Sequence, residues 1–207
     1  MKSFPKTRFF TEWFTTRYFG LKGVGAENIP KTGPFVVVSN HASFLDPYVS
    51  GFTSPDREVY FMAKEELFHN PIFGWIISQC GAFPVKRGQR DEAAIQQFHD
   101  FIHAGKPVVI YVEGTRTLDG NLHPAKKGAG RLLYNAKVPV IPTYIDGTFQ
   151  AMPKGSWFPK PRKITVFYGP PIPLDDLYNE PAEKSTFAKI AERVTEHIAK
   201  LRHTKTS

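Results

Sequence analysis

Two uninterrupted apolar runs limit the possible folds of this chain more than any other feature of its sequence. Residues 35–38 read Phe-Val-Val-Val, and residues 108–112 read Val-Val-Ile-Tyr-Val. A strand with one face in water alternates polar and apolar residues, whereas a strand covered on both faces is apolar throughout. We therefore expect both runs to be inner strands of a sheet that is flanked by helices.

The rest of the chain alternates between strand and helix patterns, which indicates a layered α/β fold. Residues 183–201 carry an apolar stripe at helical spacing, which predicts a final helix packed on the core. With 207 residues and no internal repeat or linker, we expect one domain with a mostly parallel or mixed central sheet. The expected strands are 35–39, 58–62, 107–112, 138–145 and 163–168, and the expected helices are 47–52, 72–78, 91–104, 127–136 and 183–201.

The N-terminal residues 4–20 predict a helix with an aromatic face and interleaved basic residues. Such a helix can lie in a membrane interface with its rings at headgroup depth, or it can pack the same face on the protein's own core. We expect an N-terminal amphipathic membrane-interface helix over 1–22 and a globular domain over 23–207. The aromatic residues of the helix are Phe10, Trp13, Phe14 and Tyr18.

Charge and hydropathy narrow the class of partner. The net charge is +8 and aromatic residues reach 14%, a composition that suits nucleic acid or an anionic bilayer. No stretch has the roughly 18–20 apolar residues of a spanning helix, and no apolar signal segment is present. The single cysteine, Cys80, excludes an intramolecular disulfide and fits a reducing compartment. We expect a peripheral or monotopic protein at the cytoplasmic face of a membrane.

A histidine and an aspartate follow the first apolar run directly. Residues 40–46 read Asn-His-Ala-Ser-Phe-Leu-Asp, and Pro47 then suits the first turn of a helix. Loops that follow the central strands of an open α/β sheet are where such sheets bind ligands. This loop can fold Asp46 onto one ring nitrogen of His41, which leaves the other nitrogen as a general base.

A second polar motif, Glu113-Gly114-Thr115-Arg116, follows the second apolar run. Gly114 lets the backbone approach a ligand closely, and Thr115 offers a hydroxyl. Arg116 can hold a phosphate through two parallel hydrogen bonds, with Glu113 as an ion-pair partner of the guanidinium. The pattern indicates a phosphate site, although a surface turn with a Glu–Arg pair would have the same sequence.

These motifs are two of four blocks whose order resembles the 1-acylglycerol-3-phosphate (lysophosphatidic acid) acyltransferase family. The similar region covers about residues 20–175. Two neighbours of the third block, Tyr111-Val112 and Thr117, depart from the Phe-Pro and Ser that many members carry, which affects the subfamily and leaves the charged residues in place. The blocks are Asn-His-x-x-x-x-Asp at 40–46, Gly-x-Phe-Pro-Val-x-Arg-Gly at 81–88, Glu-Gly-Thr-Arg at 113–116 and Val-Pro-Val-Ile-Pro at 138–142.

The resemblance implies transfer of an acyl group from acyl-CoA or acyl carrier protein to the free hydroxyl of 1-acylglycerol 3-phosphate, giving phosphatidic acid. It implies His41 as the base, Asp46 as the residue that orients it, and no metal or other cofactor. The expected partners are a lysophospholipid acceptor, the acyl donor and an anionic membrane surface, and not nucleic acid. The expected substrate-binding residues are Arg87, Glu113, Gly114, Thr115, Arg116 and Lys127.

The sequence also allows other functions. The acceptor can be glycerol 3-phosphate, another lysolipid, or a lipid amine or sugar without glycerol. A basic nucleic-acid-binding module would use the charge and the aromatic residues, but no known binding pattern supports it. His99 and His103 have the spacing of a metal pair on a helix, yet they flank an apolar face and no metalloprotease motif surrounds them.

Overall fold

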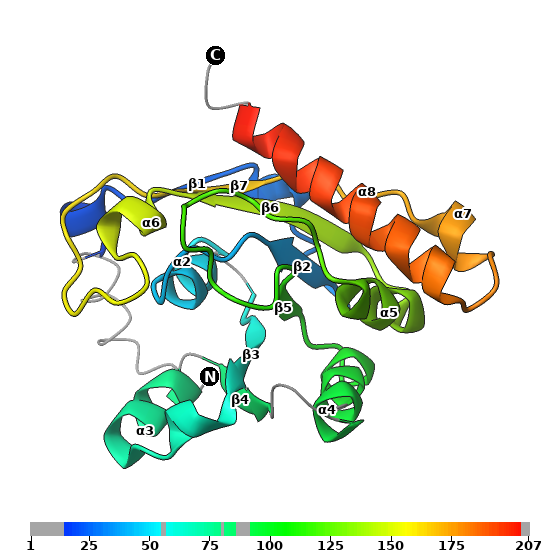
Figure 1. Cartoon of the computed structure of the whole chain (residues 1–207), viewed down its shortest axis with the longest axis horizontal. Helices are drawn as coiled ribbons and strands as arrows, with labels where there is room; N and C mark the ends of the chain where they lie inside the picture. Colours follow the sequence, from blue (N-terminus) through cyan, green and yellow to red (C-terminus); the bar gives the residue numbers. More distant parts are fainter. Residues whose placement is uncertain (1–14, 55–56, 80, 86–91, 204–207) are drawn as a thin grey trace.

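The computed structural model describes residues 15–54, 57–79, 81–85 and 92–203, and it contains a mixed seven-stranded sheet with helices on both faces (Figure 1). The strand order is β1-β7-β6-β2-β5-β3-β4. The expected α/β fold with a mostly parallel or mixed sheet is confirmed. The strands are β1 (Lys22–Val24), β2 (Val36–Ser39), β3 (Tyr60–Lys64), β4 (Ala82–Val85), β5 (Val108–Tyr111), β6 (Val140–Asp146) and β7 (Thr165–Tyr168).

Strands β6, β2, β5, β3 and β4 are parallel to one another, whereas β7 runs antiparallel to β6 and carries β1 at the edge. All five expected strands form. The sequence pattern missed the two edge strands. β1 is exposed along its whole length and so has no apolar signal, and β4 contains Pro84, which cannot donate to a ladder and is tolerated at an edge.

Side chains of the inner strands alternate between two cores, which explains why these strands are apolar throughout. Val36 and Val38 pack in one core with residues of α4, α5, α7 and α8, and Val37 packs in the other with residues of α2 and the N-terminal segment. The helices are α2 (Asp46–Phe52), α3 (Pro71–Gln79), α4 (Glu92–His103), α5 (Lys127–Ala136), α6 (Thr148–Ala151), α7 (Asp175–Tyr178) and α8 (Lys184–His203), with 3-10 turns η1 (Ala26–Asn28) and η2 (Glu65–Phe68).

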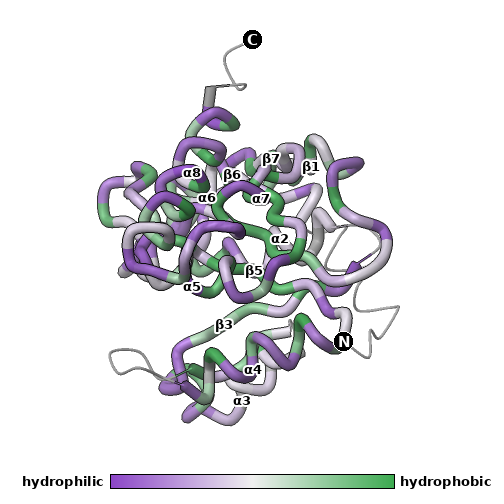
Figure 2. Tube along the Cα trace, turned by 90° about the vertical axis from the view of Figure 1, so that its right-hand side faces the viewer, coloured by the Kyte–Doolittle hydropathy of each residue, from purple (hydrophilic) through white to green (hydrophobic). Residues whose placement is uncertain are grey.

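The C-terminal helix α8 packs along α5 and β6 through one apolar face, as its sequence predicts. Ile190, Val194 and Ile198 on that face are completely buried. In Figure 2 the helix alternates between hydrophilic and hydrophobic segments, the pattern of a helix with one face on the core. The site described below lies on the sheet that this helix covers.

The N-terminal segment is described from Thr15 onwards, and residues 15–19 are helical. Phe19 is buried in the core, the Tyr18 hydroxyl donates to the Pro159 carbonyl at 2.9 Å, and the Thr15 and Tyr48 hydroxyls lie 3.0 Å apart. This end of the expected helix therefore packs on the protein, while the aromatic residues 10, 13 and 14 lie outside the described residues. No helix in the described part of the chain is long and apolar enough to span a bilayer.

Candidate active site at the carboxyl ends of β2 and β5

The two sequence motifs meet because β2 and β5 are neighbouring parallel strands, with Ser39 opposite Tyr111. Both loops therefore leave the same edge of the sheet. Two hydrogen bonds join them. The backbone N–H of His41 donates to Glu113 Oε1 at 3.0 Å, and the N–H of Thr117 donates to the His41 carbonyl at 2.8 Å. Segments more than 70 residues apart in sequence thus form one rigid unit.

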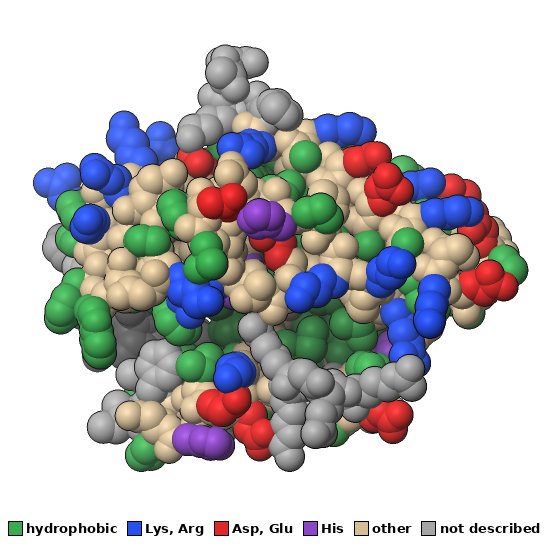
Figure 3. Space-filling view, in the orientation of Figure 1, with side chains coloured by type: hydrophobic (Ala, Val, Ile, Leu, Met, Phe, Trp, Pro, Cys, Tyr) green, Lys and Arg blue, Asp and Glu red, His purple; other side chains and the backbone are tan. Residues whose placement is uncertain are grey.

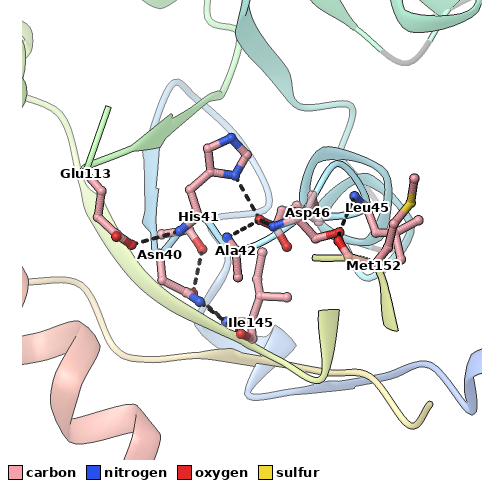
Figure 4. A network of polar contacts seen from close by, with 11 residues as sticks. Asn40, His41, Ala42, Leu45, Asp46, Glu113, Ile145 and Met152 are labelled. Carbon is pink, nitrogen blue, oxygen red and sulfur yellow. Dashed lines mark hydrogen bonds and ion pairs between the residues drawn. The ribbon is translucent and has the colours of Figure 1, made fainter. Parts of the chain in front are cut away.

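His41 and Asp46 have the geometry of an oriented base. Asp46 Oδ2 lies 2.8 Å from His41 Nδ1, and the same oxygen accepts the N–H groups of Ala42 at 2.7 Å and Ser43 at 2.8 Å (Figure 4). Asp46 is fully buried at the start of α2, and His41 is 8% exposed. A carboxylate held by backbone donors keeps the proton on Nδ1, so the lone pair of the imidazole lies on Nε2.

The imidazole also has a fixed plane. The ring of Tyr111, the last residue of β5, stacks on it with centroids 4.2 Å apart and an interplanar angle of 20°. Burial raises the pKa of the Tyr111 hydroxyl well above its ordinary value, so this ring stays neutral. The sequence places Tyr111 in an apolar strand and marks it as a departure from the family pattern, but a strand sequence does not show which neighbour a ring will cover.

Asn40 sets the direction of the backbone that leads into His41. Its side chain accepts the N–H of Ile145 at 2.8 Å and donates to the Ile145 carbonyl at 3.0 Å. The amide thus continues the ladder between β2 and β6 by one residue, in the way a backbone group would. Its place in the first motif was the only signal for this role.

Glu113 makes a contact that its sequence motif does not indicate. The Glu113 Oε1 atom accepts the His41 N–H at 3.0 Å. The side chain is 4% exposed, and burial raises the pKa of this carboxyl although the bond from His41 opposes the shift. Glu113 therefore positions the loop that carries His41.

The turn after β5 carries positive charge. Arg116 lies with its guanidinium 3.6 Å from the centroid of the Phe44 ring, and Thr115 is exposed. Gly114 has φ +69°, and a Cβ there would lie 3.3 Å from Lys126 Cδ and 3.6 Å from its Nζ. The Lys126 side chain thus lies over the turn that the glycine opens.

Lys126 was not among the expected binding residues, whereas its neighbour Lys127 was. Lys127 is the exposed first residue of α5, and Lys126 is the residue before it, with its N–H bonded to the Val112 carbonyl. The sequence does not distinguish the two adjacent lysines. In the structure it is the side chain of Lys126 that lies beside Gly114. Arg87 lies outside the described residues, beyond the end of β4.

Asp119 braces the far side of the same turn. It accepts hydrogen bonds from the Thr117 hydroxyl, at 2.6 Å, and from the Asn121 N–H, at 2.9 Å, and His123 Nε2 lies 3.0 Å away. These donors hold the pKa of the Asp119 carboxyl far below its usual range. Asp119 is exposed, so its charge remains at the surface beside the loop.

Metal ligands do not gather here. Within the described ranges, no group of three or more His, Cys, Asp or Glu side chains is placed to hold a metal ion. The ring centroids of His99 and His103 on α4 are 6.5 Å apart.

The space-filling view shows a hollow with hydrophobic side chains at its floor, between the upper body of the molecule and the lower part that contains α3 and α4 (Figure 3).

The chain is similar to known proteins over the strands and loops that form the site. A sequence model of the Acyltransferase family matches residues 21–146. A chloroplastic 1-acyl-sn-glycerol-3-phosphate acyltransferase of Brassica napus is 38% identical over 64% of this chain and 39% of its own length. The 1-acyl-sn-glycerol-3-phosphate acyltransferase of Bacillus subtilis is 28% identical over 88% of both chains.

A solved structure has the same fold. The 1-acyl-sn-glycerophosphate acyltransferase of Thermotoga maritima superposes with a TM-score of 0.69 and 27% identity, over 96% of this chain and 84% of that one. The chain spans between about two fifths and one half of the plant and algal relatives it matches at 33–38% identity. Since the family match covers the strands and loops that form the site, the chain belongs to the Acyltransferase family, and its relatives there are 1-acyl-sn-glycerol-3-phosphate acyltransferases.

Proposed function

We propose that this protein transfers a fatty acyl group from an acyl thioester to the free hydroxyl of 1-acylglycerol 3-phosphate, which gives phosphatidic acid. The observation that carries the proposal is the 2.8 Å contact between Asp46 and His41 Nδ1, which leaves Nε2 as a base beside a cationic turn. The names of the relatives support the same reaction.

The acceptor binds through its phosphate. Arg116 and Lys126 adjoin one turn, and the guanidinium offers paired N–H donors that match phosphate oxygens. A phosphate held there places the glycerol hydroxyl toward the end of β2, where His41 lies. Arg87 and Lys127 are further candidate ligands of the phosphate or the donor.

His41 then acts as general base. Nε2 takes the proton of the hydroxyl as its oxygen attacks the thioester carbonyl, and Asp46 stabilises the imidazolium that forms. The tetrahedral intermediate collapses with loss of the thiolate, which receives the proton from His41. General-base catalysis contributes typically about 10²–10⁴-fold, and orientation of the reactants contributes in addition.

Ser43 does not serve as a nucleophile in this scheme. Its hydroxyl is buried, donates to the Met152 carbonyl at 2.7 Å and accepts the N–H of Leu45 at 3.1 Å. Both bonds brace the loop between His41 and Asp46. A thioester donor needs no enzyme nucleophile, so we expect direct transfer from thioester to hydroxyl without an acyl-enzyme.

The test is an acyl-transfer assay with palmitoyl-CoA or palmitoyl-acyl carrier protein as donor, and lysophosphatidic acid or glycerol 3-phosphate as acceptor. We expect phosphatidic acid from the wild type and a loss of about 10²–10⁴-fold in His41→Ala. The matched control is His99→Ala, which removes a half-buried histidine of α4. Undiminished turnover by His41→Ala would exclude it as the base, and product from glycerol 3-phosphate alone would change the acceptor.

The lipid acceptor and the charge of +8 also support association with an anionic membrane, as a peripheral or monotopic protein at its cytoplasmic face. The N-terminal segment 1–22 would supply part of that contact. Deletion of residues 1–14 tests this, because a longer deletion would remove Phe19 from the core. Sedimentation with anionic vesicles should weaken, and unchanged sedimentation would contradict the assignment.

A further inference from the structure

The loop between α6 and β7 exposes two adjacent aromatic rings. Trp157 is 90% exposed and Phe158 is 83% exposed, the highest values for large hydrophobic side chains in the described part of the chain. Single exposed apolar residues are common on protein surfaces, but adjacent rings of this size mark a site that another apolar medium covers. The residues 153–163 are named the aromatic loop below.

Hydrogen bonds hold the two ends of the aromatic loop in place, so the two exposed rings have a defined position on the surface. The Lys160 N–H donates to the Ala151 carbonyl at 2.8 Å, and the Ser156 N–H donates to the Pro153 carbonyl at 3.0 Å. The Tyr18 hydroxyl holds the Pro159 carbonyl from the N-terminal helix. Three prolines, at 153, 159 and 161, further restrict the backbone.

The charges around the rings define what the loop can contact. Its four basic side chains are all exposed, and no acidic residue occurs from 147 to 174. In Figure 3 hydrophobic and Lys/Arg side chains gather at the left-hand end of the molecule, where Figure 1 draws this yellow loop. Exposed aromatic side chains suit the boundary between headgroups and acyl chains of a bilayer, and the surrounding cations suit the phosphates of anionic lipids. The basic residues are Lys154, Lys160, Arg162 and Lys163.

The aromatic loop leaves the same edge of the sheet as the candidate active site. It follows the carboxyl end of β6, where Ile145 pairs with Asn40. Met152, at the start of the connection, accepts the hydrogen bond of Ser43 in the loop of the base. A surface that bound the aromatic loop would therefore lie beside the edge where His41 meets its acceptor.

We propose that the aromatic loop docks the protein on an anionic phospholipid bilayer, with Trp157 and Phe158 at headgroup depth and the four basic residues on lipid phosphates. The inference rests on the proposed function for its purpose, delivery of a bilayer-held acceptor to His41. It adds to that function a docking element within the globular domain, separate from the N-terminal segment.

Vesicle sedimentation tests the surface directly. The variant Trp157→Ser/Phe158→Ser should bind equimolar phosphatidylcholine–phosphatidylglycerol vesicles about tenfold or more weakly. The variant Lys160→Gln/Arg162→Gln should lose about fivefold per charge on these vesicles and little on pure phosphatidylcholine. The matched control is Trp75→Ser on α3, a tryptophan that is 62% exposed, and it should bind like the wild type.

A second readout follows Trp157 itself. In the variant Trp13→Phe/Trp75→Phe it is the sole tryptophan of the chain. Its emission should shift to the blue and be quenched by brominated lipid when vesicles are added. Unshifted emission, or equal losses of vesicle binding in the loop variant and in Trp75→Ser, would overturn the proposal. So would a loop variant that binds vesicles normally but loses self-association, since the rings would then cover a second copy.

Activity separates this proposal from the proposed function. With lysophosphatidic acid held in vesicles, the loop variant should be slower than the wild type, and with a short-chain acceptor free in solution the two should be equal. A wild type that is inactive with both acceptors would refute the proposed function, while sedimentation and fluorescence would still decide on docking. Equal rates with the vesicle-held acceptor would refute delivery by this loop.

Discussion

Glu113 is a buried carboxylate that accepts a hydrogen bond from the backbone of the His41 loop, and this contact explains why a charged group is kept in the interior at this position. Its oxygen takes the His41 N–H from a neighbouring loop, so removal of the side chain would release the base. The sequence motif places Glu113 in the site but does not indicate its hydrogen bond to the His41 backbone. Spacing shows which residues share a turn, but not toward which neighbour a buried side chain points.

Glu113→Gln separates the charge of this residue from its hydrogen bond. Burial raises the folded-state pKa above the ordinary 4.5, so the contribution of Glu113 to stability is complete below that value and is lost as the pH rises through the folded pKa. Glutamine keeps the acceptor and cannot ionise. We expect the melting temperature of the variant to improve relative to wild type as the pH rises above 4.5, with kcat nearly unchanged.

The control for this measurement is Glu192→Gln on the exposed side of α8. Its difference from the wild type should not follow the same course with pH. A constant melting-temperature difference for Glu113→Gln across this range would show that burial does not raise the pKa of the residue. Because about 1 kcal/mol corresponds to about 2–4 °C in a protein of this size, thermal melts resolve the effect.

Lys126 and Lys127 make a matched pair for the phosphate site. The Lys126 side chain lies over Gly114, whereas Lys127 begins α5 at the surface. Loss of a charged hydrogen bond to phosphate weakens binding by about 1.5–3 kcal/mol, so Lys126→Ala should raise the acceptor KM by about 10–100-fold at nearly constant kcat. Lys127→Ala should raise the acceptor KM less, because Lys127 is the exposed first residue of α5. The opposite ranking would favour Lys127 over Lys126 as the main phosphate ligand.

At the scale of elements, the strands with continuous apolar sequence were predictable and the edge strands were not. Two-sided burial leaves a direct mark on composition, as in β2 and β5, whereas β1 packs so little that its three residues have no pattern. The short helices α6 and α7, of four residues each, were also missed, since one turn is too short for a periodic signal.

The contact between α5 and α8 depends on a single glycine. A Cβ on Gly130 would overlap the carbonyl oxygen of Phe187, so the helices approach closely only without a side chain there. Gly130→Ala should lower the free energy of unfolding by about 1–3 kcal/mol, measured by denaturant titration, because it forces the two helices apart. Gly128→Ala in the same helix has open space and should leave stability equal or higher by up to about 1 kcal/mol. Equal losses in both variants would attribute the effect to α5 alone.

At the scale of the whole molecule, strand order was the information that sequence lacked. The motifs are more than 70 residues apart, and they meet only because β5 lies beside β2 in a sheet whose order does not follow the chain. Local patterns could predict that each loop ends a buried strand, and the resemblance could group them. Neighbourhood in a sheet is set by how all the strands and helices pack together, which no single segment records.

The same sheet edge carries the aromatic loop, and the N-terminal helix contacts that loop through Tyr18. If both segments bind one bilayer at the same time, their free energies of binding add. Deletion of residues 1–14 and the substitution Trp157→Ser/Phe158→Ser should then weaken vesicle binding in the combined variant by the product of the two separate factors. Vesicle sedimentation of the four proteins at one ionic strength measures this, and the charge of +8 predicts that all partition less as salt rises. If the combined variant binds vesicles as well as the single variant with the lower affinity does, the two segments do not contact the membrane together.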